Sequence, residues 1–215
     1  MATKKVTYPA SLEIDYPKKL NRVSTFFRLI WAIPIVVIMV IISAEGTRSY
    51  TDELGRKVVE SGPGIAGALF AATAMMILFR QRYPKWWFDF NLELNRFSTR
   101  VCAYLLLLTD KYPSTEDQQS VHLTLDYPNV KKDLNRWLPL IKWLLAIPHY
   151  FVLVVLVIFA AIATITAWFA ILFTGKYPKG LFEFVVGVGR WGWRVAAYAF
   201  LLNTDKYPPF SLKNR

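Results

Sequence analysis

Two runs of apolar residues fill much of the first half of the chain. Residues 26–44 carry one charge, Arg28, near the start of the run, and residues 64–79 carry none. A helix rises about 1.5 Å per residue, so about 20 apolar residues cross the roughly 30 Å hydrocarbon core of a bilayer. These runs predict membrane spans at about 26–44 and 62–79, the second of which extends into the preceding loop.

A longer apolar stretch lies in the second half of the chain. In residues 138–174 the only basic side chains are Lys142 and His149. As one helix this stretch would extend roughly 55 Å, which is too long for a single crossing. We therefore predict a hairpin of two spans, at about 138–158 and 160–174, joined by a tight turn.

Short motifs recur in the same order in both halves, and this recurrence is the most specific feature of the sequence. The matched motifs are Asp15, Tyr16 and Pro17 with Asp126, Tyr127 and Pro128; Tyr83, Pro84 and Lys85 with Tyr177, Pro178 and Lys179; and the turns that contain Asp110 and Asp205. We therefore divide the chain into two tandem units, 1–113 and 114–215. The units differ chiefly by a polar loop, residues 46–64, in the first.

Charged residues recur at helical spacing later in each unit. The stripe consists of Asp89, Glu93, Arg96, Arg100 and Tyr104 in the first unit and Glu183, Arg190, Arg194 and Tyr198 in the second. Such spacing puts these side chains on one face of a helix. It predicts interfacial amphipathic helices at about 85–108 and 179–202, with aromatic rings at headgroup depth.

The alternative is that residues 87–108 cross the bilayer, which would make the units inverted repeats, a common transporter plan. That crossing would bury several charges, each at a cost of a few kcal/mol.

The segments 6–14 and 121–125 alternate apolar and polar residues, which predicts short strands that pair as a small sheet. The expected fold class is thus an all-α integral membrane protein of two tandem repeats, each a transmembrane hairpin plus a cytoplasmic interfacial helix.

Composition and charge support a membrane location. Apolar residues make up 54% of the chain, and Lys and Arg outnumber Asp and Glu by 26 to 15, a balance atypical of soluble domains. Ten basic residues lie in residues 80–142 and seven in 176–215, against three in the loop 45–63. We therefore expect a multi-pass protein of the cell (inner) membrane with both termini cytoplasmic, in contact with anionic headgroups. The single cysteine excludes an intramolecular disulfide.

Arg28 and Lys142 occupy matching positions within the apolar runs. They are candidates for lipid-phosphate or anion contacts, or for cations that snorkel to the membrane boundary. The further candidates for lipid, anion or partner contacts are Arg96, Arg100, Arg190 and Arg194. We interpret the aspartates of the recurrent motifs as turn formers whose carboxylates accept nearby backbone hydrogen bonds. Neither a catalytic nor a metal motif is found, and no cofactor is expected.

With these motifs, the chain resembles a bacterial and archaeal membrane family, domain of unknown function family 4389. The resemblance rests on residues 15–34, which follow the pattern DYPKKLNRxxxFFRxxxAIP, and on residues 167–212. It extends over nearly the whole chain, with departures in the first unit, where Trp86 stands in place of Gly180. The resemblance implies an integral membrane protein and supplies no activity.

Three function classes follow from these patterns. The first is a non-catalytic anchor, scaffold or accessory subunit, favoured by the absence of catalytic motifs and by the aromatic cytoplasmic face. The second is a small transporter or oligomeric channel, and the third is a lipid-interacting or lipid-modifying protein. The expected partners are the bilayer and either further copies of the chain or other membrane proteins. Nucleic acid is not expected, because the mixture of Trp and Arg also belongs to a membrane interface.

Overall fold

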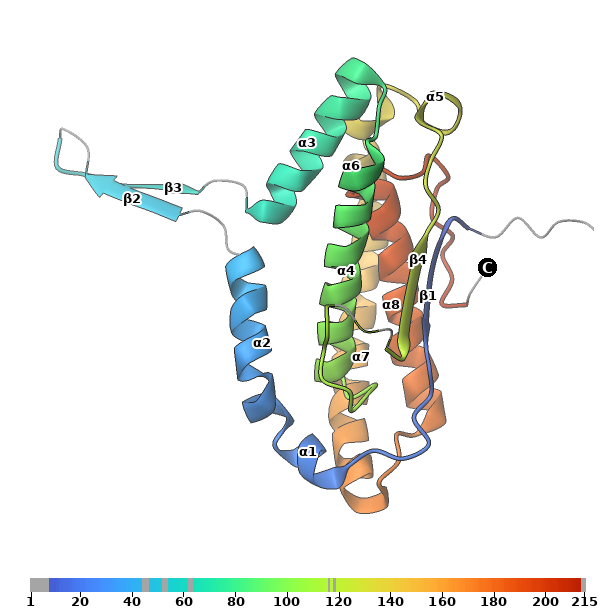
Figure 1. The fold of residues 1–215 in the computed structure, drawn as a ribbon. Helices are drawn as coiled ribbons and strands as arrows, with labels where there is room; N and C mark the ends of the chain where they lie inside the picture. Colours follow the sequence, from blue (N-terminus) through green and yellow to red (C-terminus); the bar gives the residue numbers. More distant parts are fainter. Residues whose placement is uncertain are drawn as a thin grey trace, which may run out of the picture.

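The computed structural model describes residues 8–43, 47–51, 54–61, 64–115, 117 and 119–213. These residues form three layers, seen edge-on in Figure 1: a strand pair, two long amphipathic helices, and an outer set of apolar helices.

The first layer is the antiparallel pair of β1 (Ala10–Ile14) and β4 (Val121–Leu125), called the ribbon below. Leu12 lies opposite Leu123, and both side chains are buried. The alternation of apolar and polar residues thus puts one face of the ribbon against the helices, as a half-buried strand requires. The predicted strand pairing is confirmed.

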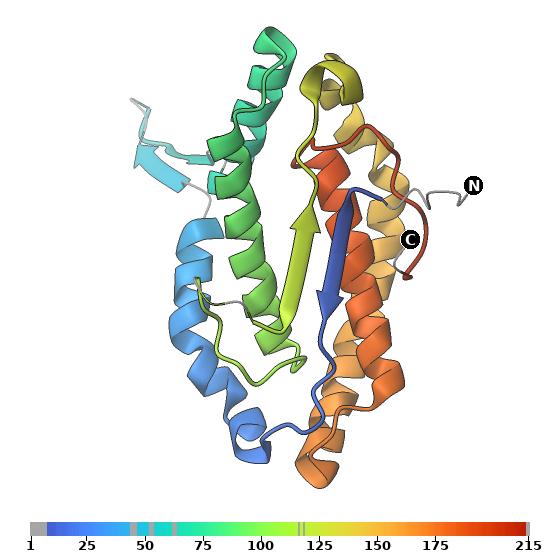
Figure 2. The ribbon, with the colours of Figure 1, turned by 45° about the vertical axis from the view of Figure 1, so that its right-hand side comes forward.

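The second layer consists of α4 (Lys85–Leu105) and α8 (Lys179–Ala199), which flank the ribbon in Figure 2. Both helices begin directly after a proline, Pro84 or Pro178. A proline there sets an extended entry into the helix and has no backbone N–H of its own that would need a partner. Helices were predicted at these places and are present; each ends three residues before its predicted end.

The third layer is apolar and consists mainly of α2 (Arg28–Ser43), α3 (Ile65–Arg80) and α7 (Ile147–Thr174). One stripe of α7 is buried against the rest of the molecule, namely Ala160, Ala163, Ala167 and Ile171. These residues follow steps of three and four, so they share one helix face. α2 packs on α4 through a small cluster that includes Ala32 and Ile35.

Shorter elements connect the layers. They are α1 (Arg22–Phe26), the hairpin of β2 (Thr47–Thr51) and β3 (Lys57–Ser61), α5 (Val130–Asp133), the 3-10 helix η1 (Leu138–Leu140) and α6 (Lys142–Leu145). The β2–β3 hairpin projects away from the three layers in both ribbon views.

The predicted hairpin of spans at 138–158 and 160–174 is wrong, because α7 is one continuous helix of 28 residues. The residues at the expected turn are Phe159, Ala160, Ala161 and Ile162. None of them interrupts a helix, and Ala is the strongest helix former. The chain breaks earlier instead, between α6 and α7, where Pro148 occupies the first turn of α7.

The predicted fold class is also wrong. Among the described residues, α7 is the one helix long and apolar enough to cross a membrane, whereas α2 and α3 have 16 residues each. α2 and α3 do not form a hairpin of spans, since they follow one another along the same side of the molecule (Figure 1). The structure therefore shows neither a multi-span all-α protein nor two tandem transmembrane hairpins, and multi-pass insertion has no support.

Candidate functional site

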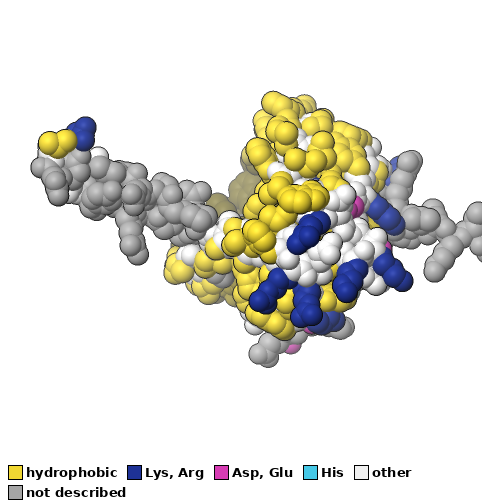
Figure 3. Space-filling model, turned by 90° about the horizontal axis from the view of Figure 1, so that it is seen from above, with side chains coloured by type: hydrophobic (Ala, Val, Ile, Leu, Met, Phe, Trp, Pro, Cys, Tyr) yellow, Lys and Arg dark blue, Asp and Glu magenta, His cyan; other side chains and the backbone are white. Residues whose placement is uncertain are grey.

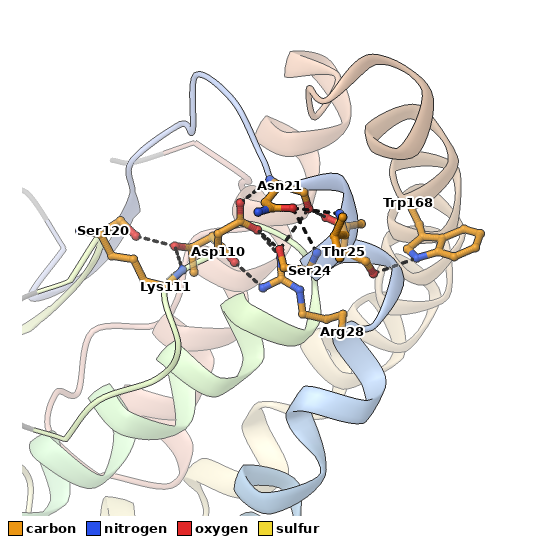
Figure 4. Close-up of polar contacts among 10 residues, drawn as sticks. Asn21, Ser24, Thr25, Arg28, Asp110, Lys111, Ser120 and Trp168 are labelled. Carbon is orange, nitrogen blue, oxygen red and sulfur yellow. Dashed lines mark hydrogen bonds and ion pairs between the residues drawn. The ribbon is translucent and has the colours of Figure 1, made fainter.

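The candidate site lies where α1, the start of α2 and the turn after α4 meet (Figure 4). Asn21 caps α1, and its side-chain oxygen accepts hydrogen bonds from the backbone N–H groups of Val23 and Ser24. The backbone N–H of Asn21 in turn donates to Asp110 Oδ2 at 2.6 Å. A turn residue far along the chain thus holds the beginning of the first helix in place.

Arg28 is the buried centre of this site, with 1% of its surface exposed. Its guanidinium donates from Nη1 to the Thr109 carbonyl at 2.8 Å and forms an ion pair from Nη2 to Asp110 Oδ1 at 2.5 Å. The guanidinium carbon lies 4.1 Å from the centre of the Tyr104 ring, which adds a cation–π contact. Arg28 Nε is buried and has no hydrogen-bond partner among the described residues.

Lys142 makes a matching set of contacts at the other end of the molecule. Its ammonium donates to the Thr204 carbonyl at 2.8 Å and pairs with Asp205 Oδ1 at 2.6 Å. Asp205 Oδ2 also accepts from the backbone N–H of Asn135 at 2.5 Å. Burial lowers the pKa of Lys142, and the Asp205 carboxylate opposes this shift. Arg28 and Lys142 therefore each have one carboxylate and one carbonyl as partners.

The four arginines of the helix stripes bind backbone carbonyls. Arg96 Nε donates to the Leu123 carbonyl at 3.1 Å, and Arg190 Nε donates to the Leu12 carbonyl at 2.9 Å. These bonds join α4 to β4 and α8 to β1, so each strand lies on the helix of the opposite sequence unit. Arg96 also forms an ion pair with Glu93, at 2.5 Å.

The remaining two arginines hold the segments that follow their helices. Arg100 donates to the Ser114 carbonyl at 2.7 Å, and Arg194 donates to the carbonyls of Lys213, at 3.1 Å, and Ser211. Burial lowers the pKa of Arg194. The structure thus places the six basic candidates at separate positions along the fold, and each has a partner within the chain.

The recurrent tyrosines also bridge distant segments. The Tyr16 hydroxyl donates to the Tyr177 carbonyl at 2.5 Å, and the Tyr127 hydroxyl donates to the Tyr83 carbonyl at 2.5 Å. Of the neighbouring motif positions, Pro17 is half-buried and Pro128 buried, whereas the side chains of Asp15 and Asp126 are exposed. Asp15 lies 3.2 Å from His122 across the ribbon. These motifs fasten segments far apart in sequence, a longer-range role than the local turn we predicted.

A groove opens beside Arg28, and the sequence patterns did not point to it. Its volume is about 330 Å³, and it lies between the ends of α2, α4 and α7. The lining residues are Thr25, Phe26, Arg28, Leu29, Leu105, Leu107, Thr164, Ile165, Trp168 and Phe169. Trp168 closes one side by donating from Nε1 to the Thr25 carbonyl at 3.2 Å. The groove is therefore apolar, with one buried guanidinium in its wall.

The described part of the chain holds no group of three or more His, Cys, Asp or Glu side chains that could bind a metal ion. His149 is buried, and its Nδ1 accepts from Trp191 Nε1 at 3.0 Å. The Phe210 ring stacks on it with the ring centres 4.0 Å apart. Beside these contacts, the site offers an apolar groove, which is a common feature of binding sites.

Comparison with known proteins supports the family resemblance over the last third of the chain. Residues 137–211 match the family model described as domain of unknown function (DUF4389). This match covers η1, α6, α7 and α8 and the turn that contains Asp205. Comparisons with curated proteins and with solved structures gave no significant match.

Proposed function

We propose that the protein is a non-catalytic membrane anchor or scaffold. Its apolar outer layer sits in one side of the bilayer of the cell membrane, and its ribbon layer faces water, where it binds partner proteins. The observation that carries this proposal is the extent of apolar side chain exposed on one layer. A surface of that kind marks a membrane or protein interaction site.

The exposed apolar surface is concentrated on α2 and α7. Only 17% of the most apolar 18-residue segment of α7 is buried. Leu29 on α2 is 77% exposed, and Phe151 and Phe173 on α7 are 73% and 78% exposed. A core helix of a soluble protein would be mostly buried, and a signal sequence would lie near the N-terminus, so neither explains α7. Lipid contact accounts for both its composition and its exposure.

The position of the charged layer favours α7 lying in the plane of the membrane. The ribbon and α4 run alongside α7 (Figures 1 and 2), and the Glu93–Arg96 pair lies near the middle of α4. If α7 crossed the bilayer along its axis, these charges would lie at core depth, at a cost of roughly 2.5–3.5 kcal/mol each. An in-plane α7 leaves them at the water side.

The segregation of side chains supports the same orientation. Viewed along the helices in Figure 3, apolar side chains cover the top and left of the molecule, whereas basic side chains gather toward the middle and lower right. An amphipathic layer of this kind buries its apolar face roughly 5–10 Å into the boundary between headgroups and acyl chains. Basic side chains at its rim then attract anionic lipids.

The orientation is tested by measuring the depth of nitroxide labels in bilayers. In a Cys102→Ser background, single cysteines replace four exposed α7 residues in turn: Phe151, Ile158, Ile165 and Phe173. The outer two are about 33 Å apart along the helix. An in-plane helix gives four similar depths, whereas a crossing helix gives shallow ends and a deep centre, which would overturn the proposed orientation. A label at His122 on the ribbon should report water.

The scaffold role is tested by gentle extraction from native membranes, followed by mass determination of the intact particle. A partner protein in fixed stoichiometry is the expected result. It should be lost when ribbon residue His122, which is 52% exposed at its side chain, is replaced by a bulky Trp. The matched control is Ile158→Trp on the apolar layer, which leaves the ribbon unchanged. Particles that contain only this chain and lipid would overturn the scaffold role.

A further inference from the structure

We propose that the hollow at the start of α4, lined by residues 81–84 and 127–131, binds the phosphate group of an anionic phospholipid through Arg82 and Lys131. This inference rests on the proposed membrane location and adds a lipid class to it. Two independent observations carry it: an open hollow whose described lining holds cations and no acid, and exposed aromatic side chains beside the cations around it.

The hollow lies between two connecting segments at the upper end of Figure 1. Residues 81–84 lead from α3 in the apolar layer to α4 in the second layer, and residues 127–131 lead from β4 in the ribbon to α5. In the proposed orientation, a site between these connections lies at headgroup depth. Its volume of about 580 Å³ is within the usual range of ligand sites.

Hydrogen bonds hold the walls of the hollow in place. The Tyr127 hydroxyl donates to the Tyr83 carbonyl at 2.5 Å and so joins the two connecting segments. Gln81 ends α3 in the left-handed conformation, with φ at 46°, and the backbone N–H of Arg82 donates to the Met76 carbonyl at 3.3 Å. The backbone that carries Arg82 is therefore fixed before a ligand binds, which lowers the cost of binding.

The charge of the hollow attracts an anion. Arg82 and Lys131 are exposed, and the described lining contains neither Asp nor Glu. Arg80 and Lys132 are exposed directly beside the lining segments and add positive charge. None of these four side chains forms an ion pair with another described residue. Guanidinium and ammonium groups without a counter-ion in the protein are well suited to bind phosphate.

Other hollows on the molecule carry carboxylates. A neighbouring one, of about 460 Å³, has three aspartates and one lysine among its described lining residues. At the opposite end of the molecule, Asp110 shares a hollow with Lys19 and Arg22. A phosphate group would meet negative charge in both of these hollows. The hollow beside Arg82 is therefore the favoured place for an anion.

Aromatic side chains beside the cations favour a lipid as the source of the phosphate. Phe79 follows Leu78 at the end of α3, next to Arg80, and is 69% exposed. Trp86 and Trp137 adjoin basic residues in the same way and are 69% and 65% exposed. Exposed tryptophan beside basic side chains is typical of the headgroup region of a bilayer.

These aromatic side chains lie at one end of the apolar layer. Arg136 brings Trp137 to this end, because its guanidinium donates to the Phe79 carbonyl at 3.0 Å. Figure 3 looks onto the same end and shows basic side chains around a patch of polar surface, with apolar side chains next to it. A lipid satisfies both parts of this surface, since its phosphate meets the cations while its acyl chains cover the apolar layer. A soluble polyanion would leave the apolar part bare.

The test is lipid binding by the full-length protein in a mild non-ionic detergent, measured by native mass spectrometry. Phosphatidylglycerol and phosphatidylcholine with the same acyl chains are supplied in equal amounts, so that the two lipids differ in headgroup charge. Each basic residue near a membrane surface raises the affinity for anionic lipid about fivefold. With Arg82 and Lys131 both in contact, the wild-type protein should prefer phosphatidylglycerol roughly 10- to 30-fold.

The informative variant is Arg82→Gln with Lys131→Gln, which should bind the two lipids almost equally. Its matched control is Lys18→Gln with Lys19→Gln, which removes two exposed cations at the opposite end of the molecule and should keep the preference. A third variant, Arg82→Lys with Lys131→Arg, keeps both charges and should also keep it. Because all four side chains are exposed, each variant should unfold at the temperature of the wild type, and thermal unfolding checks this.

Three results would overturn the headgroup site. The first is equal binding of the two lipids by the wild-type protein. The second is the same loss of preference in both glutamine variants, which would show that net charge alone attracts the lipid. The third is displacement of phosphatidylglycerol by glycerol phosphate or by a short RNA at equal phosphate concentration, since a soluble anion would then be the better ligand.

A parallel measurement separates this site from the proposed membrane location. Flotation of the protein with vesicles of phosphatidylcholine alone depends on the apolar layer and not on headgroup charge. Loss of flotation would refute the membrane location. Flotation without a preference for phosphatidylglycerol would refute only the headgroup site.

Discussion

Removing the carboxylate from Asp110 should destabilise the protein far more than removing an exposed one. Asp110 is the counter-ion of Arg28, and it also accepts the backbone N–H of Asn21. The informative variant is Asp110→Ala, which leaves the guanidinium buried without a negative partner. Asp89→Ala is the control, since Asp89 pairs with Lys85 four residues earlier and is 48% exposed at its side chain.

The expected loss follows from the burial of Arg28. Removing one partner of a buried ion pair costs about 3–5 kcal/mol, because the remaining charge stays desolvated. Contact with the Tyr104 ring and the Thr109 carbonyl persists and keeps the loss within this range. For a chain of this size, the unfolding temperature should fall by roughly 6–20 °C. Asp89→Ala should lower stability by less than about 1 kcal/mol, since exposed pairs contribute little.

A double variant tests whether the loss of stability in Asp110→Ala comes from the unpaired buried charge. Arg28→Met with Asp110→Ala removes both charges and puts an apolar side chain in the buried position. Such replacements are often neutral or stabilising relative to the broken pair. The double variant should therefore unfold at a higher temperature than Asp110→Ala alone, despite having one more substitution.

The order of stability of the three variants is measured by thermal unfolding in one detergent and at one scan rate, monitored by near-ultraviolet circular dichroism. The expected ranking of unfolding temperature is Asp89→Ala first, the double variant next and Asp110→Ala last. If Asp110→Ala unfolds within about 2 °C of Asp89→Ala, the ion pair contributes no more than a surface pair, and the reasoning is refuted.

Three further outcomes are expected. Gly187→Ala should lower stability by about 1–3 kcal/mol, because a Cβ there would lie 2.9 Å from Leu212 Cβ, whereas Gly192→Ala, with nothing within 4 Å, should be neutral or stabilising; thermal unfolding compares them. Cys102 is exposed, but the residues around its thiol desolvate it and raise its pKa. Its alkylation by a small maleimide at pH 8 should therefore be slower than that of a free cysteine, and equal rates would contradict the shift. Burial lowers the pKa of Lys142 below its ordinary 10.5. Between the lowered pKa and 10.5 the unfolded state binds more protons than the folded state, so stability should rise with pH up to about 10.5. Alkaline unfolding titrations should show this rise in the wild type, and Lys142→Met should abolish it.

The amphipathic elements could be predicted because their signals are local. The charged stripe and Pro84 or Pro178 at its start are enough to mark α4 and α8. Alternation within 121–125 similarly marks a strand that buries one face. These signals depend on neighbours within a few residues, and the structure forms the elements where those neighbours lie.

The candidate site could not be assembled in the same way. Arg28 and Asp110 were each singled out, but they are 82 positions apart, and no spacing rule connects a buried cation with a distant turn aspartate. The same applies to the pair of Lys142 and Asp205. The groove needed the relative placement of three helices, which depends on tertiary packing.

The error in α7 arose from assuming that each apolar run must cross the bilayer. Two courses are open to a long apolar helix at a membrane: it can cross, with its length limited to the thickness, or it can lie in the plane, with no such limit. In the first half of the chain a polar loop, which contains β2 and β3, separates α2 from α3. At the corresponding place in the second half, α7 is one uninterrupted helix. Beyond the loop, α3 continues along the side of the molecule on which α2 began (Figure 1). A loop that interrupts a course without reversing it is not the turn of a transmembrane hairpin. One explanation therefore covers both the shared direction of α2 and α3 and the unbroken length of α7. All three helices belong to an apolar layer, and the length of this layer is set by the charged helices and the ribbon that pack on it.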